Sequence, residues 1–276
     1  MDIYSNVFAK MYGDNYIDLN SPNIVDLGCN STSKGNQHKY YDVLNNRYIK
    51  GQFDYQGVLW KDYMVENLSS IIGSQLNTEI KVVKQNIVKL SNGTMGCISD
   101  DFAVDKEWVP LAKLTDTVKL SKNFNKSFRV FSDILNVYTS IGIDIELSKE
   151  YLSTMIILDF LLGNEDRHFN NIGVLFDIHE SRYEISPLFD FGLGLFEYDT
   201  KYNIKYLYAA KALMEGRPFS RDLSDAFDMI INVCGTDKIR KMCCNITIPN
   251  KDLFPNELGY EYFIDSFEYM KGKLGL

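Results

Sequence analysis

Three polar side chains, Asp166, Asn171 and Asp190, are spaced so that they could perform one kind of chemistry together. Asp166 and Asn171 lie five residues apart in one short stretch, and Asp190 follows in Asp190-Phe191-Gly192. Phosphoryl transfer needs little covalent help from a protein, but it needs a base near the acceptor hydroxyl and oxygen ligands for Mg²⁺. Asp166 could orient the hydroxyl and accept its proton, while Asn171 and Asp190 could hold the metal ion. The pattern is therefore suited to moving a phosphoryl group onto a hydroxyl.

The elements around these residues must bring them to one place. Residues 148–162 carry apolar side chains at helical spacing, with Ser148 as a candidate N-cap, and they run into the polar cluster at Asp166. A β-like run then leads to Asp190. Stretches rich in Asp and Asn are usually turns, so Asp166 and Asn171 alone would favour a turn. The helix before them and the strand that ends in a second acid favour a site instead.

The order of residues in this loop resembles particular kinases. The histidine follows the aspartate in Asp166-Arg167-His168, whereas ordinary protein kinases have the order His-Arg-Asp. Asp-Arg-His-x-x-Asn followed by residues 186–190, Ser-Pro-Leu-Phe-Asp, resembles the HipA-like serine/threonine kinases, which include the toxin kinases of bacterial toxin–antitoxin systems. Phosphatidylinositol kinases share the loop and the Asp-Phe-Gly, but the Ser-Pro-Leu-Phe-Asp context and residues 217–220, Arg-Pro-Phe-Ser, resemble HipA relatives. Full HipA proteins carry an extra N-terminal subdomain for which 276 residues leave no room, so the resemblance is to a compact form.

Composition limits the classes of partner and compartment. With 45% hydrophobic and 24% charged residues the chain reads as an ordinary globular protein. A net charge of -8 and a pI near 5.0 argue against direct nucleic-acid or anionic-membrane partners, which would require a clustered basic surface. The five cysteines are odd in number and scattered, and the first residues lack the pattern of a signal peptide. We therefore expect free thiols and a cytoplasmic protein.

The first hundred residues have the features of a small β-rich lobe. Residues 23–28 predict a strand that enters a donor-rich loop over residues 29–37, whose backbone N–H groups and hydroxyls could cradle phosphates. The loop matches no G-x-G-x-x-G or Walker pattern, so an ordinary surface loop is the alternative. Two runs rich in Tyr, Val and Ile flank Asn45-Asn46 and predict a hairpin with a two-residue turn. Asn92-Gly93 predicts a second hairpin.

Lys50 lies on the second strand of the first predicted hairpin and precedes a predicted helix over residues 59–72, which Gly73 would end. A lysine on a strand is usually solvated, but the order of hairpin, lysine strand and helix is that of kinases. Asp62 and Glu66 lie one turn apart on the polar face of the helix, and either could pair with Lys50. The resemblance assigns Lys50 to the phosphates of ATP, and its register favours Asp62 as the partner.

The same resemblance implies further roles. Ser33 and Lys34 would contact the phosphates, residues 99–102 would form the hinge between the lobes, and Asp101 and Phe102 would contact the adenine there. His168 would contact phosphate or shape the loop. HipA-like kinases resemble one another in phosphorylating a serine of the phosphate-binding loop, so Ser31, Thr32 and Ser33 are candidates for autophosphorylation.

We therefore expect an α+β, two-lobed protein-kinase-like fold, with a β-rich N-lobe over residues 1–102 and a larger helical C-lobe over residues 103–276. The resemblance implies ATP- and Mg²⁺-dependent phosphorylation of serine or threonine on a protein substrate. A toxin-type member would also have an antitoxin partner and a translation-related substrate. Two alternatives stay open, a phosphatidylinositol-type lipid kinase and a nucleotide-binding pseudokinase. Apart from the helix before Asp166, helical spacing in the C-lobe is found near residues 128–140, 203–215, 222–233 and 260–273.

Overall fold

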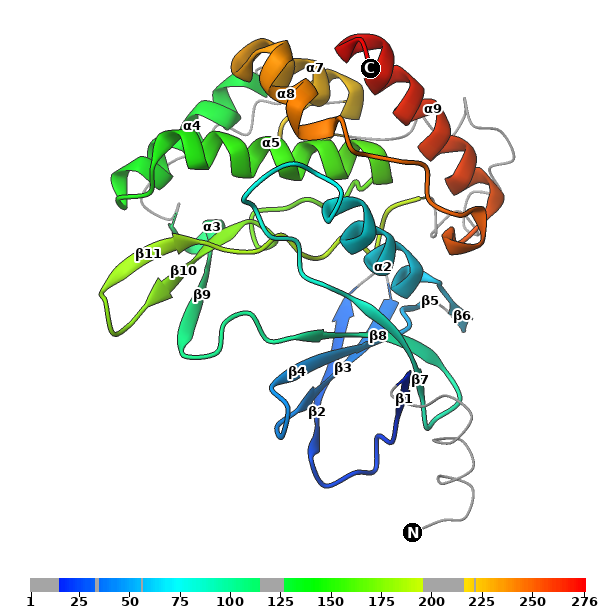
Figure 1. Ribbon diagram of the computed structural model, residues 1–276. Helices are drawn as coiled ribbons and strands as arrows, with labels where there is room; N and C mark the ends of the chain where they lie inside the picture. The colour runs from blue at the N-terminus through cyan, green and yellow to red at the C-terminus, as the bar shows by residue number, and fades with distance from the viewer. Residues whose placement is uncertain (1–14, 33–34, 56, 115–126, 196–215, 221) are drawn as a thin grey trace.

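The computed structural model describes residues 15–32, 35–55, 57–114, 127–195, 216–220 and 222–276. Figure 1 shows strands of the N-terminal part at one end of the molecule and helices of the C-terminal part at the other. The expected α+β, two-lobed architecture is confirmed. In the described residues, the strands of the N-terminal sheet follow the spatial order β1-β7-β8-β4-β3-β5-β6, with β2 also paired to β3. Their bounds are β1 Tyr16–Ile17, β2 Ile24–Thr32, β3 Gly35–Asp42, β4 Arg47–Gly51, β5 Asp54–Tyr55, β6 Val58–Leu59, β7 Asn86–Leu90 and β8 Met95–Asp100.

The hairpin of β3 and β4 is confirmed, but its loop is longer than predicted. Asp42 pairs with Arg47 in the antiparallel register, so residues 43–46 form the connection and not Asn45-Asn46 alone. The reason is the Asp42 carboxylate, which accepts the N–H groups of Leu44 and Asn45 and pairs with the Arg47 guanidinium at 2.8 Å. An aspartate that caps its own turn in this way favours the longer loop. The β7–β8 hairpin is confirmed, and Gly93 has the positive φ of 89° that its turn requires.

The predicted phosphate-binding loop over residues 29–37 is mostly strand. β2 continues through Thr32 and β3 starts at Gly35, with Thr32 and Gly35 as register partners. Pairing the two strands satisfies backbone groups that a loop would have left for a ligand. The prediction of a loop is therefore wrong over most of its length, and Ser33 and Lys34 lie outside the described residues.

Helix α2, Asp62–Gly73, starts three residues later than predicted because β6 occupies the start of the expected helix. Gly73 has a packing role and does not end the helix in a left-handed conformation, since the cap residue Ser74 is right-handed. A Cβ added to Gly73 would lie 2.5 Å from Val82 Cγ2. The glycine therefore allows the segment that follows α2 to fold closely back against it.

The helices of the C-terminal part are close to those expected. The predictions near residues 128–140, 148–162, 222–233 and 260–273 are confirmed, α8 was not predicted, and residues 203–215 lie outside the described part. The N-cap of α5 is Asp144, whose Oδ1 accepts the Leu147 N–H at 2.9 Å, so the prediction of Ser148 is wrong. Ser148 lies buried inside α5 and donates to the Asp144 carbonyl. The bounds are α3 Leu111–Leu114, α4 Ser127–Ser140, α5 Ile145–Leu162, α7 Leu223–Cys234, α8 Thr236–Cys243 and α9 Glu257–Leu274.

A second sheet of three strands frames the polar loop. It contains β9 (Lys106–Pro110), β10 (Gly173–Asp177) and β11 (Arg182–Ile185) in the order β11-β10-β9. β10 starts directly after the loop of Asp166 and Asn171, and β11 leads to Asp190. The division of the chain at residues 102 and 103 stays a prediction.

Two hydrophobic cores hold these elements. A small core under the N-terminal sheet contains Ile49, Val88 and Ile98. A large core joins α4, α5, α7 and α9, and it also includes Val65, Leu68 and Ile72 of α2. Helix α2 therefore packs as part of the helical lobe although it lies within the N-terminal hundred residues. In the part of the chain that the structure describes, no helix combines the length and hydropathy needed to cross a bilayer.

The contact at Gly73 gives a stability test. Alanine normally improves a helix interior by about 0.5–1 kcal/mol relative to glycine. We expect Gly73→Ala to lower the free energy of unfolding by about 1–3 kcal/mol instead, because its Cβ would overlap Val82. Gly272→Ala in α9 is the matched control, because a Cβ there meets nothing within 4 Å. Urea unfolding of both variants measures the difference, and equal stabilisation by both would contradict the packing role.

Candidate active site

A lysine held between two carboxylates forms the centre of the site. Lys50 Nζ on β4 lies 2.8 Å from Glu66 Oε1 on α2 and 2.8 Å from Asp190 Oδ1, which follows β11. The Glu66 side chain is 2% exposed and that of Lys50 15%, whereas Asp190 is 35% exposed. The cluster therefore connects three segments that are far apart in the sequence, and its open side is at Asp190.

Glu66 is the helix partner of Lys50, so the assignment of Asp62 is wrong. Asp62, at the first position of α2, accepts hydrogen bonds from Gln37 Nε2 at 2.7 Å and from the Phe53 N–H at 3.1 Å. It thereby anchors the start of the helix to the sheet. Glu66 also accepts the Phe191 N–H through Oε2 at 3.3 Å. Both acids are buried and neither lies on a solvated helix face.

The electrostatics keep Lys50 and Asp190 charged. Burial would lower the pKa of Lys50, but Asp190 and Glu66 outweigh it, and the pKa lies well above its usual value. Burial would raise the pKa of Asp190, but the Lys50 ammonium outweighs it, and the pKa lies well below its usual range. The backbone of Asp190 has a φ of 65°, a left-handed conformation that is uncommon outside glycine and is often found at functional sites.

A second lysine, Lys39, belongs to the same face of the sheet. Lys39 and Lys50 are register partners on β3 and β4, so their side chains project from the same face of the sheet. Burial lowers the pKa of Lys39, and so does the neighbouring Lys50 ammonium. Lys39 had no predicted role in the site. The two lysines provide positive charge beside the two acids of the cluster.

The loop after α5 is built around Arg167, whose side chain is fully buried. Its guanidinium forms a two-pronged pair with Asp159 on α5, at 2.9 Å from Nη2 to Oδ1 and 3.0 Å from Nε to Oδ2. Its Nη1 donates to the carbonyl oxygens of Asn171, at 3.2 Å, and Phe189, at 2.9 Å. One side chain thus joins the helix, the end of the loop and the residue before Asp190.

The predicted catalytic residues share this loop. Asn171 Nδ2 donates to the Asp166 carbonyl at 3.2 Å, which leaves the amide oxygen as the atom that Asn171 can offer to a cation. His168 is exposed, and its Nδ1 accepts the Asn170 N–H at 3.2 Å. His168 was predicted either to contact phosphate or to shape the loop, and this hydrogen bond within the loop supports the second role. Arg167 brings the backbone of Asn171 beside that of Phe189, so Asn171 and Asp190 are brought to one region.

The predicted hinge residues are held by contacts within the protein. Asp101 accepts the Tyr41 hydroxyl at 3.1 Å and the Ala103 N–H at 2.8 Å. Phe102 packs against Phe189 with ring centroids 5.3 Å apart. Phe102 therefore belongs to an aromatic cluster that directly adjoins Asp190. Tyr48, two residues before Lys50 on β4, lies on the same face of the sheet as Lys50 and is 40% exposed.

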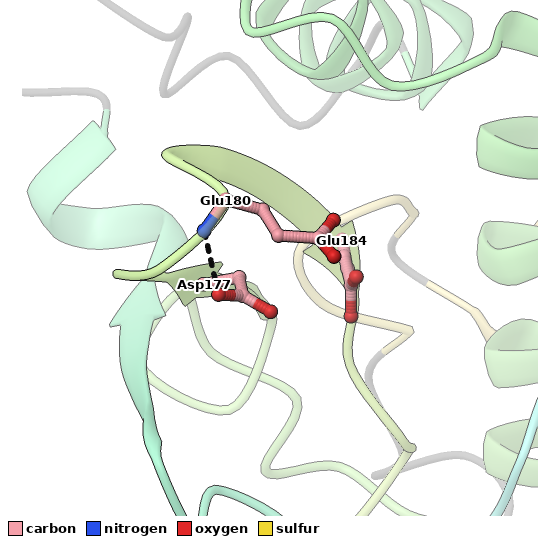
Figure 2. A group of neighbouring side chains, drawn as sticks. All are labelled: Asp177, Glu180 and Glu184. Carbon is pink, nitrogen blue, oxygen red and sulfur yellow. Dashed lines mark hydrogen bonds between the residues drawn. The ribbon is translucent and has the colours of Figure 1, made fainter.

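Another carboxylate cluster is not a good metal site. Figure 2 shows Asp177, Glu180 and Glu184 close together at the turn between β10 and β11. Lys106 bonds to Glu184 and lies 3.7 Å from Asp177, while Arg182 lies within 2.8 Å of Glu180 and Glu184. These two cations already neutralise most of the charge, so Asn171 and Asp190 remain the better candidates for Mg²⁺.

Besides Lys39, sequence reasoning missed Arg167 and Asp159 as residues that organise the site. The signal was present, because Asp159 interrupts an otherwise apolar helix and a buried carboxylate requires a partner. Arg167 is the nearest cation to Asp159 in the sequence, and its place inside the Asp-Arg-His motif hid this pairing.

The buried pair gives a second stability test. Arg167→Met leaves the Asp159 carboxylate buried without its cation and should cost about 3–5 kcal/mol. Arg182→Met, at an exposed pair, is the control and should cost about 0–1 kcal/mol. In urea unfolding, the double variant Asp159→Leu/Arg167→Met should lose less than the sum of the two single losses. Strictly additive losses would show that the pair does not act as a unit.

Comparison with known proteins supports the fold. No protein-family model and no curated protein sequence matches the chain. Among solved structures it is similar to the crystal structure of a Helicobacter pylori proinflammatory kinase, CtkA, with a TM-score of 0.60 and 19% sequence identity. The similarity covers 94% of this chain and 95% of that chain. At this identity the likeness concerns the fold, and this chain therefore has a two-lobed kinase-like fold.

Proposed function

We propose that this protein is a kinase that transfers the γ-phosphate of ATP to a serine or threonine hydroxyl of a protein substrate. The observation that carries the proposal is the Lys50–Glu66–Asp190 cluster, held beside the Asp166–Asn171 loop by Arg167. The match to a kinase over nearly the whole chain supports the reaction class. The serine/threonine specificity rests on the HipA-like resemblance of the sequence.

The side chains fit the demands of phosphoryl transfer. Lys50 and Lys39 would neutralise phosphate charge. Asp166 would orient the acceptor hydroxyl and take its proton as the P–O bond to the acceptor forms and the bond from the γ-phosphorus to the ADP leaving group breaks. The oxygens of Asn171 and Asp190 suit Mg²⁺, which prefers oxygen ligands. When bound there, Mg²⁺ would supply positive charge that offsets the negative charge of the phosphates. Phe102 is the candidate contact for the adenine, and Ser33 and Lys34 stay predicted phosphate contacts.

One assay separates this proposal from its two alternatives. The protein is incubated with Mg²⁺ and γ-labelled ATP alone, with a generic protein substrate, and with phosphoinositide vesicles. Label on protein supports a protein kinase, and label on lipid would replace it with a lipid kinase. Binding of ATP without transfer to either would support a pseudokinase. An antitoxin partner, a translation-related substrate and a cytoplasmic location stay predictions from the sequence.

The roles of the two aspartates predict different defects. Asp166→Asn should leave ATP binding close to that of the wild type and lower the transfer rate by about 10²–10⁴. Asp190→Asn should also weaken Mg²⁺-dependent nucleotide binding, because it removes a metal ligand. Calorimetry and label transfer measure the two effects, with exposed Asp237→Asn as the control. Wild-type transfer by Asp166→Asn would overturn its assignment.

Autophosphorylation is a further prediction of the resemblance. Incubation with Mg²⁺ and ATP should add phosphate to Ser31, Thr32 or Ser33 and lower nucleotide affinity, since a phosphate adds about -1.5 to -2 charge. Peptide mass spectrometry before and after incubation checks the modification. An active kinase whose peptide over residues 29–39 stays unmodified would exclude this form of control.

A further inference from the structure

An open groove of about 590 Å³ lies between the small sheet and the turn that joins α4 to α5. Residues 181–185, which include β11, form one wall, and residues 140–144 with Leu147 form the other. No residue of the candidate active site lines this groove. Its volume falls within the range of about 300–1,000 Å³ that is typical of binding sites. The groove is therefore separate from the candidate active site.

Among the described strands, β11 in the wall of the groove lies at the edge of its sheet. β11 pairs with β10, and in the described part of the chain it pairs with no other strand. The described backbone hydrogen bonds outside the regular elements also involve none of residues 182–185. In an antiparallel pair, alternate residues direct their N–H and C=O groups away from the partner strand. Such groups can hydrogen-bond to an extended chain that lies alongside them.

The walls also offer apolar contacts. Ile141 and Leu147 come from the helical side, and Tyr183 and Ile185 alternate along β11 and so share one face of it. All four are partly buried and pack against the large core on their inner side. A rigid wall with partly exposed apolar side chains suits an extended segment that places every second side chain into the groove.

The charged residues in and beside the groove indicate which kind of peptide would bind there. The charged residues that line the groove are two acids, Asp144 and Glu184, and one cation, Arg182. Beside Glu184, outside the lining, lie two further acids, Asp177 and Glu180, and one further cation, Lys106. Figure 2 shows Asp177, Glu180 and Glu184 side by side where the chain turns from β10 into β11. Asp144 on the opposite wall is exposed and belongs to none of the ion pairs of the described residues, although the Lys149 ammonium, which pairs with Glu146, lies near enough to interact with it. A basic segment complements this excess negative charge.

We propose that the groove binds an extended, basic peptide segment of a partner protein, which adds to the small sheet as a strand alongside β11. Backbone hydrogen bonds between the peptide and the unpaired edge of β11 would align the peptide with that strand. Apolar side chains of the peptide would fill the groove. Its basic side chains would face Asp144 and the cluster of Asp177, Glu180 and Glu184. The proposal does not depend on phosphoryl transfer, because peptide binding is measured without nucleotide.

The test uses labelled hexapeptides in which Arg alternates with Val, Ile, Leu or Tyr. We expect saturable binding by fluorescence anisotropy and slower amide hydrogen exchange at residues 182–185 in the complex. Asp144→Asn should weaken binding about two- to fivefold, since it removes one surface charge while an Asn side chain still caps α5. Asp237→Asn, in the first turn of α8, is the matched control and should bind as the wild type does.

Backbone methylation of the peptide identifies the binding mode. Two versions are made, each N-methylated on one alternate set of residues, so that only one version loses the amides that face β11. We expect one version to lose binding and the other to keep it. Equal binding by both, absence of saturable binding by every peptide, or unchanged exchange at β11 would overturn the proposal. Slow exchange at β11 that instead depends on protein concentration, without peptide, would assign the groove to a second copy of the chain.

Discussion

A buried guanidinium is the constraint on which the geometry of the site depends. Arg167 lies in the interior, where an unpaired charge would cost several kcal/mol, so its donors must all be used within the protein. The Asp159 carboxylate on α5 accepts hydrogen bonds from Nε and Nη2. The carbonyl oxygens of Asn171 and Phe189 both accept from Nη1. The planar, rigid guanidinium fixes directions as well as distances. The positions of the loop and of Asp190 therefore follow from satisfying one side chain.

Helix α2 fixes the position of the N-terminal sheet relative to this loop. Its apolar side, with Val65 and Leu68, is part of the core that also holds α5. Its polar side presents Glu66 to both Lys50 and the backbone of Phe191. The lysine strand is thus located by a helix that packs with the opposite lobe. In a kinase-like protein, the relative placement of phosphate contacts and metal ligands depends on such a helix.

The sequence predicted the two lobes, most described helices and some of the residues that meet at the site, namely Lys50, Asn171 and Asp190, because these have strong periodicity or a composite motif. It failed where a short polar side chain decided the outcome. Asp42 caps its own turn, and the two-residue loop predicted without it would place Tyr41 opposite Lys50 instead of Lys39. Asp62 was favoured over Glu66 because spacing along a helix does not show which carboxylate faces the sheet. Hydrophobic periodicity also assigns acidic residues to the exposed face of a helix, because it does not include the partners, distant in the chain, that allow an acid to be buried.

The register of β3 and β4 places a limit on sequence change far from the site. Loops usually tolerate insertions and deletions, and residues 43–46 are a surface connection. Side chains alternate between the faces of a strand, so a single-residue deletion that shifted the pairing would turn one strand over relative to the other. Lys39 and Lys50 could then no longer project from the same face. The length of this loop is accordingly expected to vary less among related sequences than its exposed position alone would suggest.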